Sequence, residues 1–253
     1  DAAALLTGYL RWRGGLSASA TVALQQFPWQ RIYPVDTGPV TLQTLRATMT
    51  LDEGQVTGKL DASLTGDVTL GQEPQTVTLS AQVDGDQQAV DIAPLTLATP
   101  AGSVAGKVSL GFTDGFAWQG DLQLHDLNPG VLDARFPGQL NGSLYTRGRT
   151  QDDVLTLEAL WDIAGRLRQE PLALQGSLSK PDETWVLSGL QLRQGDNRLS
   201  GDAQWGPVVA GAFDIALDKL HSLVPDVHGQ VRGRVGLSGS AAAPAMAIAV
   251  TAD

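Results

Sequence analysis

Phe136-Pro137-Gly138-Gln139-Leu140-Asn141-Gly142-Ser143-Leu144 contains the pattern that decides the fold. A proline turn leads into alternating residues, and because successive side chains of a β-strand point to opposite faces, Leu140, Gly142 and Leu144 share one face. The polar residues between them share the other. This stretch therefore predicts a β-strand with one apolar face, on which a glycine stands between leucines.

The same pattern recurs along the chain. A second long version runs from Val224 to Val235 and places Gly233 on its apolar face. Shorter copies, each with a glycine between apolar residues, centre on Gly8, Gly58, Gly66, Gly106, Gly165, Gly176 and Gly201. The repetition predicts one structural unit that is used many times, although its spacing is too irregular for a propeller or a strict solenoid.

Alternation of apolar and polar residues continues from Leu6 to Val250 and predicts about sixteen strands. Turn-forming residues separate them, as at Asp52-Glu53-Gly54, Asp84-Gly85-Asp86 and Asp114-Gly115. Asp-Gly between alternating runs is a strong signal for a β-hairpin, in which the neighbouring strands are antiparallel. We therefore expect an all-β protein built on a long antiparallel sheet.

Three stretches interrupt the alternation. Asn128–Arg135 suits a short helix, because Asn128 can cap it and Pro129 can take its first position. Asp218–Leu223 is a second candidate, and Phe27–Pro34, which contains two prolines, suits one helical turn or an irregular plug. The expected fold is all-β with one to three short helices.

Composition excludes several classes of function. The chain of 253 residues carries a formal net charge of −10, whereas a nucleic-acid partner would require clustered lysines and arginines. The sequence has no cysteine, three histidines and no HExxH motif, so we expect no enzyme, no metal site and no cofactor. Aspartates such as those of Asp84-Gly85-Asp86 are expected to form hairpin turns rather than a calcium site.

Two further features bear on the surroundings of the chain. The sequence contains no run of the roughly 20 apolar residues that a membrane-spanning helix needs, and Asp1–Ala4 resembles a cut inside a longer chain. The basic residues that alternate with apolar ones are expected on a solvated outer face. They are Lys59, Lys107, Arg166, Arg232 and Arg234.

Glycine on an apolar strand face has two interpretations. It can mark a bulge, or a place where twisted strands bring two backbones close together. Alternatively, the missing side chains leave a continuous trough that is lined by Leu, Val and Ile and open to an apolar ligand. Replacing Gly142 or Gly233 with Leu would distinguish the two interpretations. The substitution prevents folding if the glycine marks a bulge or close backbone contact, and it blocks the trough if the glycine leaves open space.

These features together resemble the TamB family of AsmA-like envelope proteins. The resemblance rests on Leu127-Asn128-Pro129 leading into Phe136–Gly142, on the later version between Leu220 and Gly233, on Phe27–Pro34 and on Gly239–Pro244. It implies a β-taco, which is a long antiparallel sheet folded lengthwise into an open, U-shaped groove, with residues 1–253 as a single elongated segment of a longer chain. It also implies a periplasmic location, an inner-membrane anchor in the parent chain, and work with the outer-membrane partner TamA through parts of the parent chain outside these residues.

We therefore predict that the chain conducts phospholipid between the inner and outer membranes and supports outer-membrane assembly. The acyl chains are expected to lie along the apolar face. The predicted groove-lining residues are Leu140, Gly142, Leu144, Leu155, Leu157, Trp161, Ile163, Leu172, Leu174, Leu178, Trp185, Leu187, Leu199, Trp205, Phe213, Ile215, Val231, Gly233 and Val235. The tryptophans among them have a second interpretation, as residues packed in an ordinary core.

An alternative function is a chaperone-like or structural module that assists outer-membrane protein assembly. An open sheet has unpaired backbone groups at its edges, and the strands near Leu6 and Ile248 could add strands of client proteins there. The same edges could pair with each other and form a homodimer.

Overall fold

The computed structural model describes residues 3–12, 16–25, 40–52, 54–70, 73–223 and 229–252. Sixteen strands follow one another in sequence order, from β1 to β16, in a sheet that does not close into a barrel. The chain divides into two compact units, Asp1–Leu122 and Gln123–Asp253, and the division falls within β8 (Phe116–Leu127). The expected all-β fold with an open antiparallel sheet is confirmed, and it is consistent with a β-taco.

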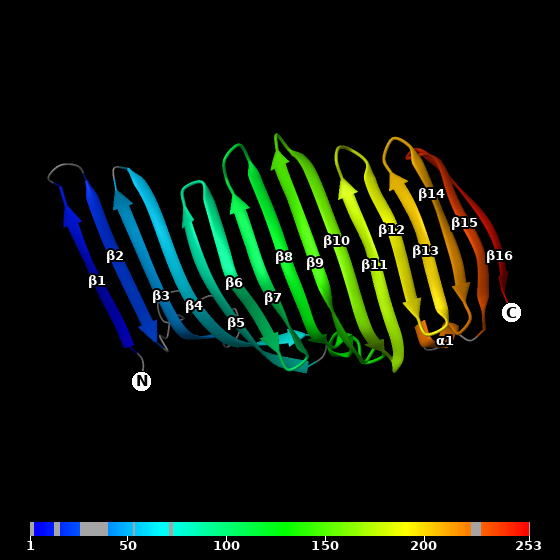
Figure 1. Ribbon diagram of the computed structural model, residues 1–253, viewed down its shortest axis with the longest axis horizontal. Coiled ribbons are helices and arrows are strands. Elements are labelled where there is room, and N and C mark those ends of the chain that lie inside the picture. Colours follow the sequence, from blue (N-terminus) through cyan, green and yellow to red (C-terminus); the bar gives the residue numbers. More distant parts are fainter. Residues whose placement is uncertain are drawn as a thin grey trace. The chain divides into compact units, whose positions relative to one another are not determined.

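In the first unit, consecutive strands from β1 to β7 pair antiparallel (Figure 1). The strands that precede β8 are β1 (Ala3–Arg11), β2 (Ser17–Gln25), β3 (Val40–Asp52), β4 (Gln55–Leu70), β5 (Glu73–Asp86), β6 (Ala89–Thr99) and β7 (Gly102–Gly111).

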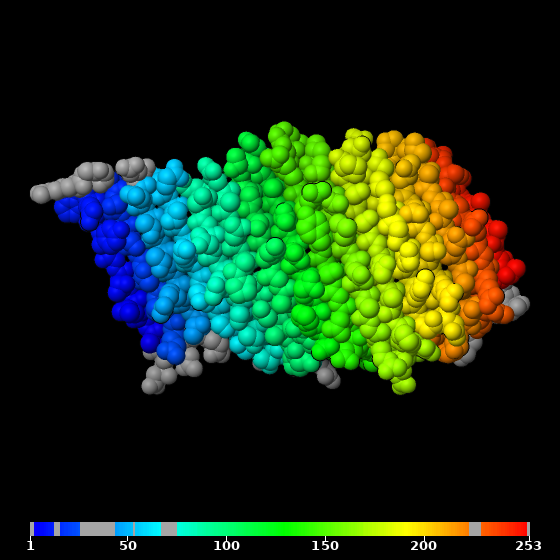
Figure 2. All heavy atoms as spheres, in the orientation of Figure 1, coloured from blue at the N-terminus to red at the C-terminus, as the bar shows by residue number. Residues whose placement is uncertain are grey.

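The second unit repeats the arrangement, again with antiparallel pairs of consecutive strands. Its strands after β8 are β9 (Gly138–Gln151), β10 (Val154–Leu167), β11 (Glu170–Lys180), β12 (Trp185–Gln194), β13 (Asn197–Trp205), β14 (Val209–Leu217), β15 (Val231–Ser240) and β16 (Ala243–Ala252). On the face that Figure 2 shows, no described element lies across the strands of this unit.

Tight turns join the strands. Asp152 and Asp153 connect β9 to β10 with φ angles of +49° and +63°, and Arg168 and Gln169 connect β10 to β11 with +51° and +69°. Positive φ at both central positions matches the twist of a β-hairpin. The predicted turn at Asp114-Gly115 is confirmed, whereas Asp84-Gly85-Asp86 belongs to β5, which continues to Asp86 before the chain turns.

Two short helices lie between strands in the second unit. The 3₁₀ helix η2 (Pro129–Val131) is capped by Asn128, whose side-chain oxygen accepts from the N–H groups of Gly130 at 3.0 Å and Gly138 at 2.9 Å. The helix expected there is thus confirmed but shorter. The second helix, α1 (Leu220–Leu223), falls in the other predicted stretch. The plug expected at Phe27–Pro34 and the turn of the second long pattern, Val224–His228, lie outside the described residues.

Glycines on the apolar face mark close contact between strand backbones. A Cβ atom added at Gly142 would lie 2.2 Å from the carbonyl oxygen of Asp162 on the neighbouring strand, and one at Gly233 would lie 2.1 Å from that of Ala249. Both distances are far too short for any side chain. At these two positions the structure agrees with the close-approach interpretation, and the glycines do not leave free space.

The sheet has almost no closed core. Of the residues that the structure describes, Val209 is the only hydrophobic one that is fully buried. A sheet packed against a second layer would bury one whole face. Neither unit therefore has the interior of a sandwich. No helix within the described ranges is long and apolar enough to cross a bilayer.

We expect Gly142→Ala to destabilise the chain by about 1–3 kcal/mol, because forcing atoms into a filled space displaces the backbone. Urea denaturation would measure the change in the free energy of unfolding. The matched control is Gly236→Ala, where the added Cβ would lie 3.9 Å from the nearest atoms of Ala247. An equal, small effect of both substitutions would contradict the close-approach interpretation.

Candidate apolar binding face

The strand registers bring all the predicted groove-lining residues to one face of the second unit. Leu144 on β9 pairs with Trp161 on β10, which pairs with Gly176 on β11. Further along, Phe213 on β14 pairs with Gly201 on β13 and with Val235 on β15. Side chains opposite each other in a sheet lie on the same face. The alternation in the sequence therefore predicted a continuous face and not scattered positions.

A bulge in β12 adds residues that alternation alone does not predict. Leu187 pairs with Ala203, and Leu190 pairs with Gly201, so the register shifts between Leu187 and Leu190. Because of this shift Leu190 and Leu192 join the apolar face, although a regular strand would turn them away. The signal in the sequence is Gly189, which has a φ of +60° and so takes a conformation that favours glycine.

The apolar face is half-buried throughout. Trp205 is the most open of the predicted residues, with 50% of its surface exposed, and all the others lie in the intermediate range. Curvature and neighbouring side chains thus shield the face without covering it. Such a face retains much of the free energy that apolar surface gains when it leaves water.

Trp161 lies at the centre of the face. Its ring carbon Cζ2 lies 2.9 Å from where a Cβ of Gly176 would be, so the indole ring packs on the bare backbone of the next strand. Its buried Nε1 finds no acceptor among the described residues. Both proposed roles for tryptophan meet here, because the ring packs against the sheet and also forms part of the apolar surface.

Helix α1 lies at the end of strands β12 and β13 (Figure 1), where it contacts the end of the apolar face through Gln194 and Asn197. Asn197, which is 2% exposed, accepts from the N–H of Lys219 at 2.8 Å and donates to the Ser222 hydroxyl at 2.6 Å. Gln194, which is fully buried, donates to the carbonyl oxygens of Ser222 at 3.0 Å and Leu167 at 3.2 Å. Gln194 and Asn197 continue the apolar phase of β12 and β13, so the face changes from apolar to polar beneath the helix.

The first unit also has an apolar face. Register joins Leu6 to Val22, Val22 to Ala47 and Ala47 to Leu60 across β1 to β4. A hollow of about 530 Å³ lies on this face between β2 and β6. The residues predicted from the sequence to line the groove all belong to the second unit, although the same alternation also indicates this first face.

The opposite face is charged. Lys59 forms an ion pair with Asp84 at 2.8 Å, and Arg232 forms one with Asp218 at 2.6 Å. The hydrogen bond to Asp84 raises the pKa of Lys59, and the one from Arg232 lowers the pKa of Asp218. These pairs are exposed and contribute little to stability, but they agree with the solvated outer face expected for the basic residues.

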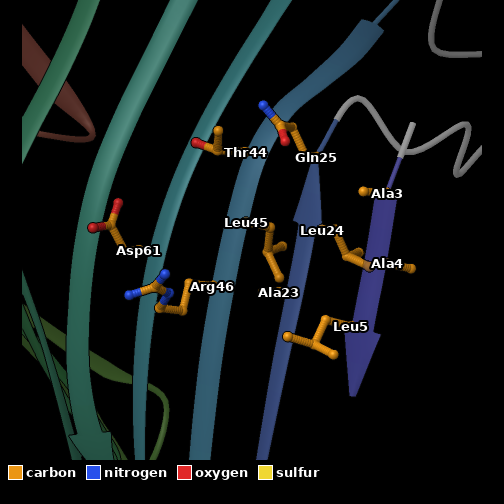
Figure 3. A pocket seen from close by; sticks show the side chains of 10 residues that line it. All are labelled: Ala3, Ala4, Leu5, Ala23, Leu24, Gln25, Thr44, Leu45, Arg46 and Asp61. Atoms are coloured by element: carbon orange, nitrogen blue, oxygen red, sulfur yellow. The ribbon is translucent and has the colours of Figure 1, made fainter. Parts of the chain in front are cut away.

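A second hollow, of about 470 Å³, lies on the charged face of β1 to β4 (Figure 3). Leu5 and Ala23 line it beside Arg46 and Asp61, whose positions are paired in register on β3 and β4. Burial of such charges against an apolar ligand would be costly. This hollow is therefore less suited to an acyl chain than the apolar one.

An open antiparallel sheet that leaves one apolar face without a second layer defines a class of β-protein distinct from sandwiches and closed barrels. Residues 53–253 match the family described as "TamB, N-terminal domain". The chain belongs to the TamB family, as its sequence patterns indicate.

One relative is a whole protein of much greater length. The translocation and assembly module subunit TamB of Haemophilus influenzae is 25% identical to this chain over 194 residues, which cover 76% of the chain and 15% of that protein. The chain thus spans a small part of its relative. No solved structure matches this chain.

We expect Asn197→Ala to release helix α1, because the substitution removes the acceptor of the Lys219 N–H and the amide that donates to the Lys219 carbonyl oxygen and to the Ser222 hydroxyl. Hydrogen–deuterium exchange should become faster in Lys219–Ser222 while strands β9 and β10 keep their protection. Ser200→Ala, at an exposed position of the same strand, is the control and should leave α1 unchanged. Unaltered exchange in the Asn197→Ala variant would show that these hydrogen bonds do not hold the helix.

Proposed function

We propose that the apolar face holds the acyl chains of phospholipids. The observation that carries this proposal is the run of half-buried apolar side chains across β9 to β15, over which the described residues place no second layer. Each methylene that leaves water contributes about 0.8 kcal/mol, so acyl chains can bind without a specific polar contact. Movement along the face would then require neither catalysis nor a cofactor.

Membership of the TamB family supports a wider role. We propose that these residues form a single elongated β-taco segment of a longer periplasmic chain anchored in the inner membrane, which conducts phospholipid between the inner and outer membranes. The name of the relative, a translocation and assembly module subunit, supports a role in outer-membrane assembly. Contact with TamA would involve other parts of the parent chain.

A photoreactive phospholipid tests the proposal on the apolar face. The protein is mixed with vesicles that contain phosphatidylethanolamine with a diazirine in one acyl chain. After illumination, we expect this lipid to label peptides from β10 and β11. Leu174→Asp should lower this labelling about tenfold, because it removes apolar contact and places a charge on the face. Gln175→Asp, on the opposite face of the same strand, should leave labelling unchanged.

The folded state of both variants is checked by circular dichroism. Labelling that is equal in the two variants, or absent from the wild-type chain, would overturn the proposal.

A second candidate function is strand addition at the sheet edges. Strand β1 is exposed along its whole length, with Leu6 at 73%, and on β16 Met246 and Ile248 are exposed at 62% and 56%. An exposed apolar edge strand offers its backbone to whichever strand lies beside it, from the parent chain or from another chain. A client strand of an outer-membrane protein, or a second copy of this chain, would suit it.

Photocrosslinkers placed in the chain distinguish the two functions. A photoreactive residue at Leu157 on the apolar face is expected to capture lipid, whereas one at Ile248 would capture peptide if strands add at the edge. Peptide adducts at Ile248 without lipid adducts at Leu157 would favour the second function over the first.

A further inference from the structure

The apolar hollow of the first unit is built around Gly58, which has more room beside it than Gly8, another glycine of the repeated pattern. A Cβ added at Gly58 would lie 4.0 Å from its nearest neighbour, the carbonyl oxygen of Thr48, whereas at Gly8 on the same face it would lie 2.5 Å from the carbonyl oxygen of Ser19. Gly58 therefore leaves open space where Gly8 allows two backbones to meet. At this one position the trough interpretation of the glycine pattern holds.

Register places a second glycine beside it. Gly58 on β4 pairs with Gly85 on β5 and with Met49 on β3. The two adjacent positions thus have no side chains, and they form the floor of the hollow. Met49, which is 60% exposed, stands at the rim, where its flexible thioether side chain can adapt to different shapes.

Most of the remaining lining is apolar. Aliphatic side chains from β2 to β6 continue the same face around the glycines, namely Ala20, Val22, Ala47, Val56, Leu60, Val83 and Val90. At the spacing of neighbouring strands the hollow extends roughly 19 Å across the sheet. A volume of about 530 Å³ is within the range of small-molecule sites.

The shape and chemistry of the lining decide the kind of ligand. A hollow that spans five strands, and whose positions on the apolar face offer neither charge nor hydrogen-bond donor, suits a flexible hydrocarbon chain and not a compact polar molecule. Four residues of the lining are polar. The side chains of Thr48 and Lys59 bond to Thr21 and Asp84 on the opposite face, and Asp86 and Gln87 lie where β5 ends and the chain turns. A polar head could remain in water beyond that end.

We propose that the hollow over Gly58 and Gly85 is a discrete binding site for one acyl chain of a lipid. This inference rests on the proposed function and makes it more specific, because lipid would pause at a defined position in the first unit and not slide over a uniform surface.

Filling the hollow tests the site. In vesicles that contain the diazirine-bearing phosphatidylethanolamine, the wild-type chain should be labelled at Met49 and in the peptide Val83–Val90. Gly58→Leu should lower this labelling about tenfold, which corresponds to the loss of roughly two buried methylenes. Labelling of β10 and β11 in the second unit should not change.

Two further variants keep the test decisive. Gly236→Leu is the matched control, since a Cβ there also has room, at 3.9 Å from Ala247. In this variant, labelling at Met49 and in Val83–Val90 should equal that of the wild type. Met49→Glu places a charge at the exposed rim, where folding tolerates it, and should reduce labelling of Val83–Val90 as Gly58→Leu does.

The outcomes separate this site from the general function. Wild-type labelling in the second unit but not over Gly58 would overturn the discrete site and leave the proposed function intact. Unchanged labelling of the hollow in folded Gly58→Leu and Met49→Glu would overturn it too. Absence of lipid labelling anywhere in the wild-type chain would overturn both.

Discussion

The antiparallel register between neighbouring strands is the constraint on which the rest of the structure depends. A slip of one residue between β9 and β10 would turn Leu140 and Leu144 to the face opposite their present partners, Gly165 and Trp161. Close backbone contacts prevent such a slip, because the space beside Gly142 is filled by the carbonyl of Asp162. The glycines thus fix the positions at which strands pair, and the apolar face follows from that pairing.

The same register leaves the apolar face open. Each strand meets only its neighbours in sequence, and no second layer of the described chain buries its leucines and valines. An unpacked face of this kind contributes less to stability than a closed core. Its exposed apolar surface therefore indicates a role in binding. Acyl chains suit it, since they need apolar contact and no fixed polar partner. Gln194 and Asn197 end the face at α1, where buried hydrogen bonds replace apolar contact.

Much of this fold follows from local sequence rules. Alternation and Asp-Gly turns predicted the strands and their antiparallel order, and Asn128 and Pro129 predicted where η2 begins. The bulge at Gly189 was not predicted, because alternation assumes an unbroken register, and Leu190 and Leu192 were therefore missed. Gln194 and Asn197 were missed for another reason. Their polar side chains look exposed in the sequence, and only the contact with α1, more than twenty residues later in the sequence, buries them.

The glycine pattern is also resolved only by the structure. Gly58 and Gly142 have the same sequence context, an apolar residue two positions away on each side. At Gly142 the neighbouring backbone fills the space, and at Gly58 the space is open. The difference depends on how closely adjacent strands approach, which a single strand does not encode. One local pattern therefore serves two purposes, contact between strands and room for a ligand.

A native mass spectrum of the chain, purified from cells without detergent, tests the central claim most directly. Binding of acyl chains to the open apolar face predicts additional mass equal to one or more phospholipids, and an organic extract of the same sample should contain those lipids. A spectrum of the bare chain alone, with no lipid in the extract, would contradict the account.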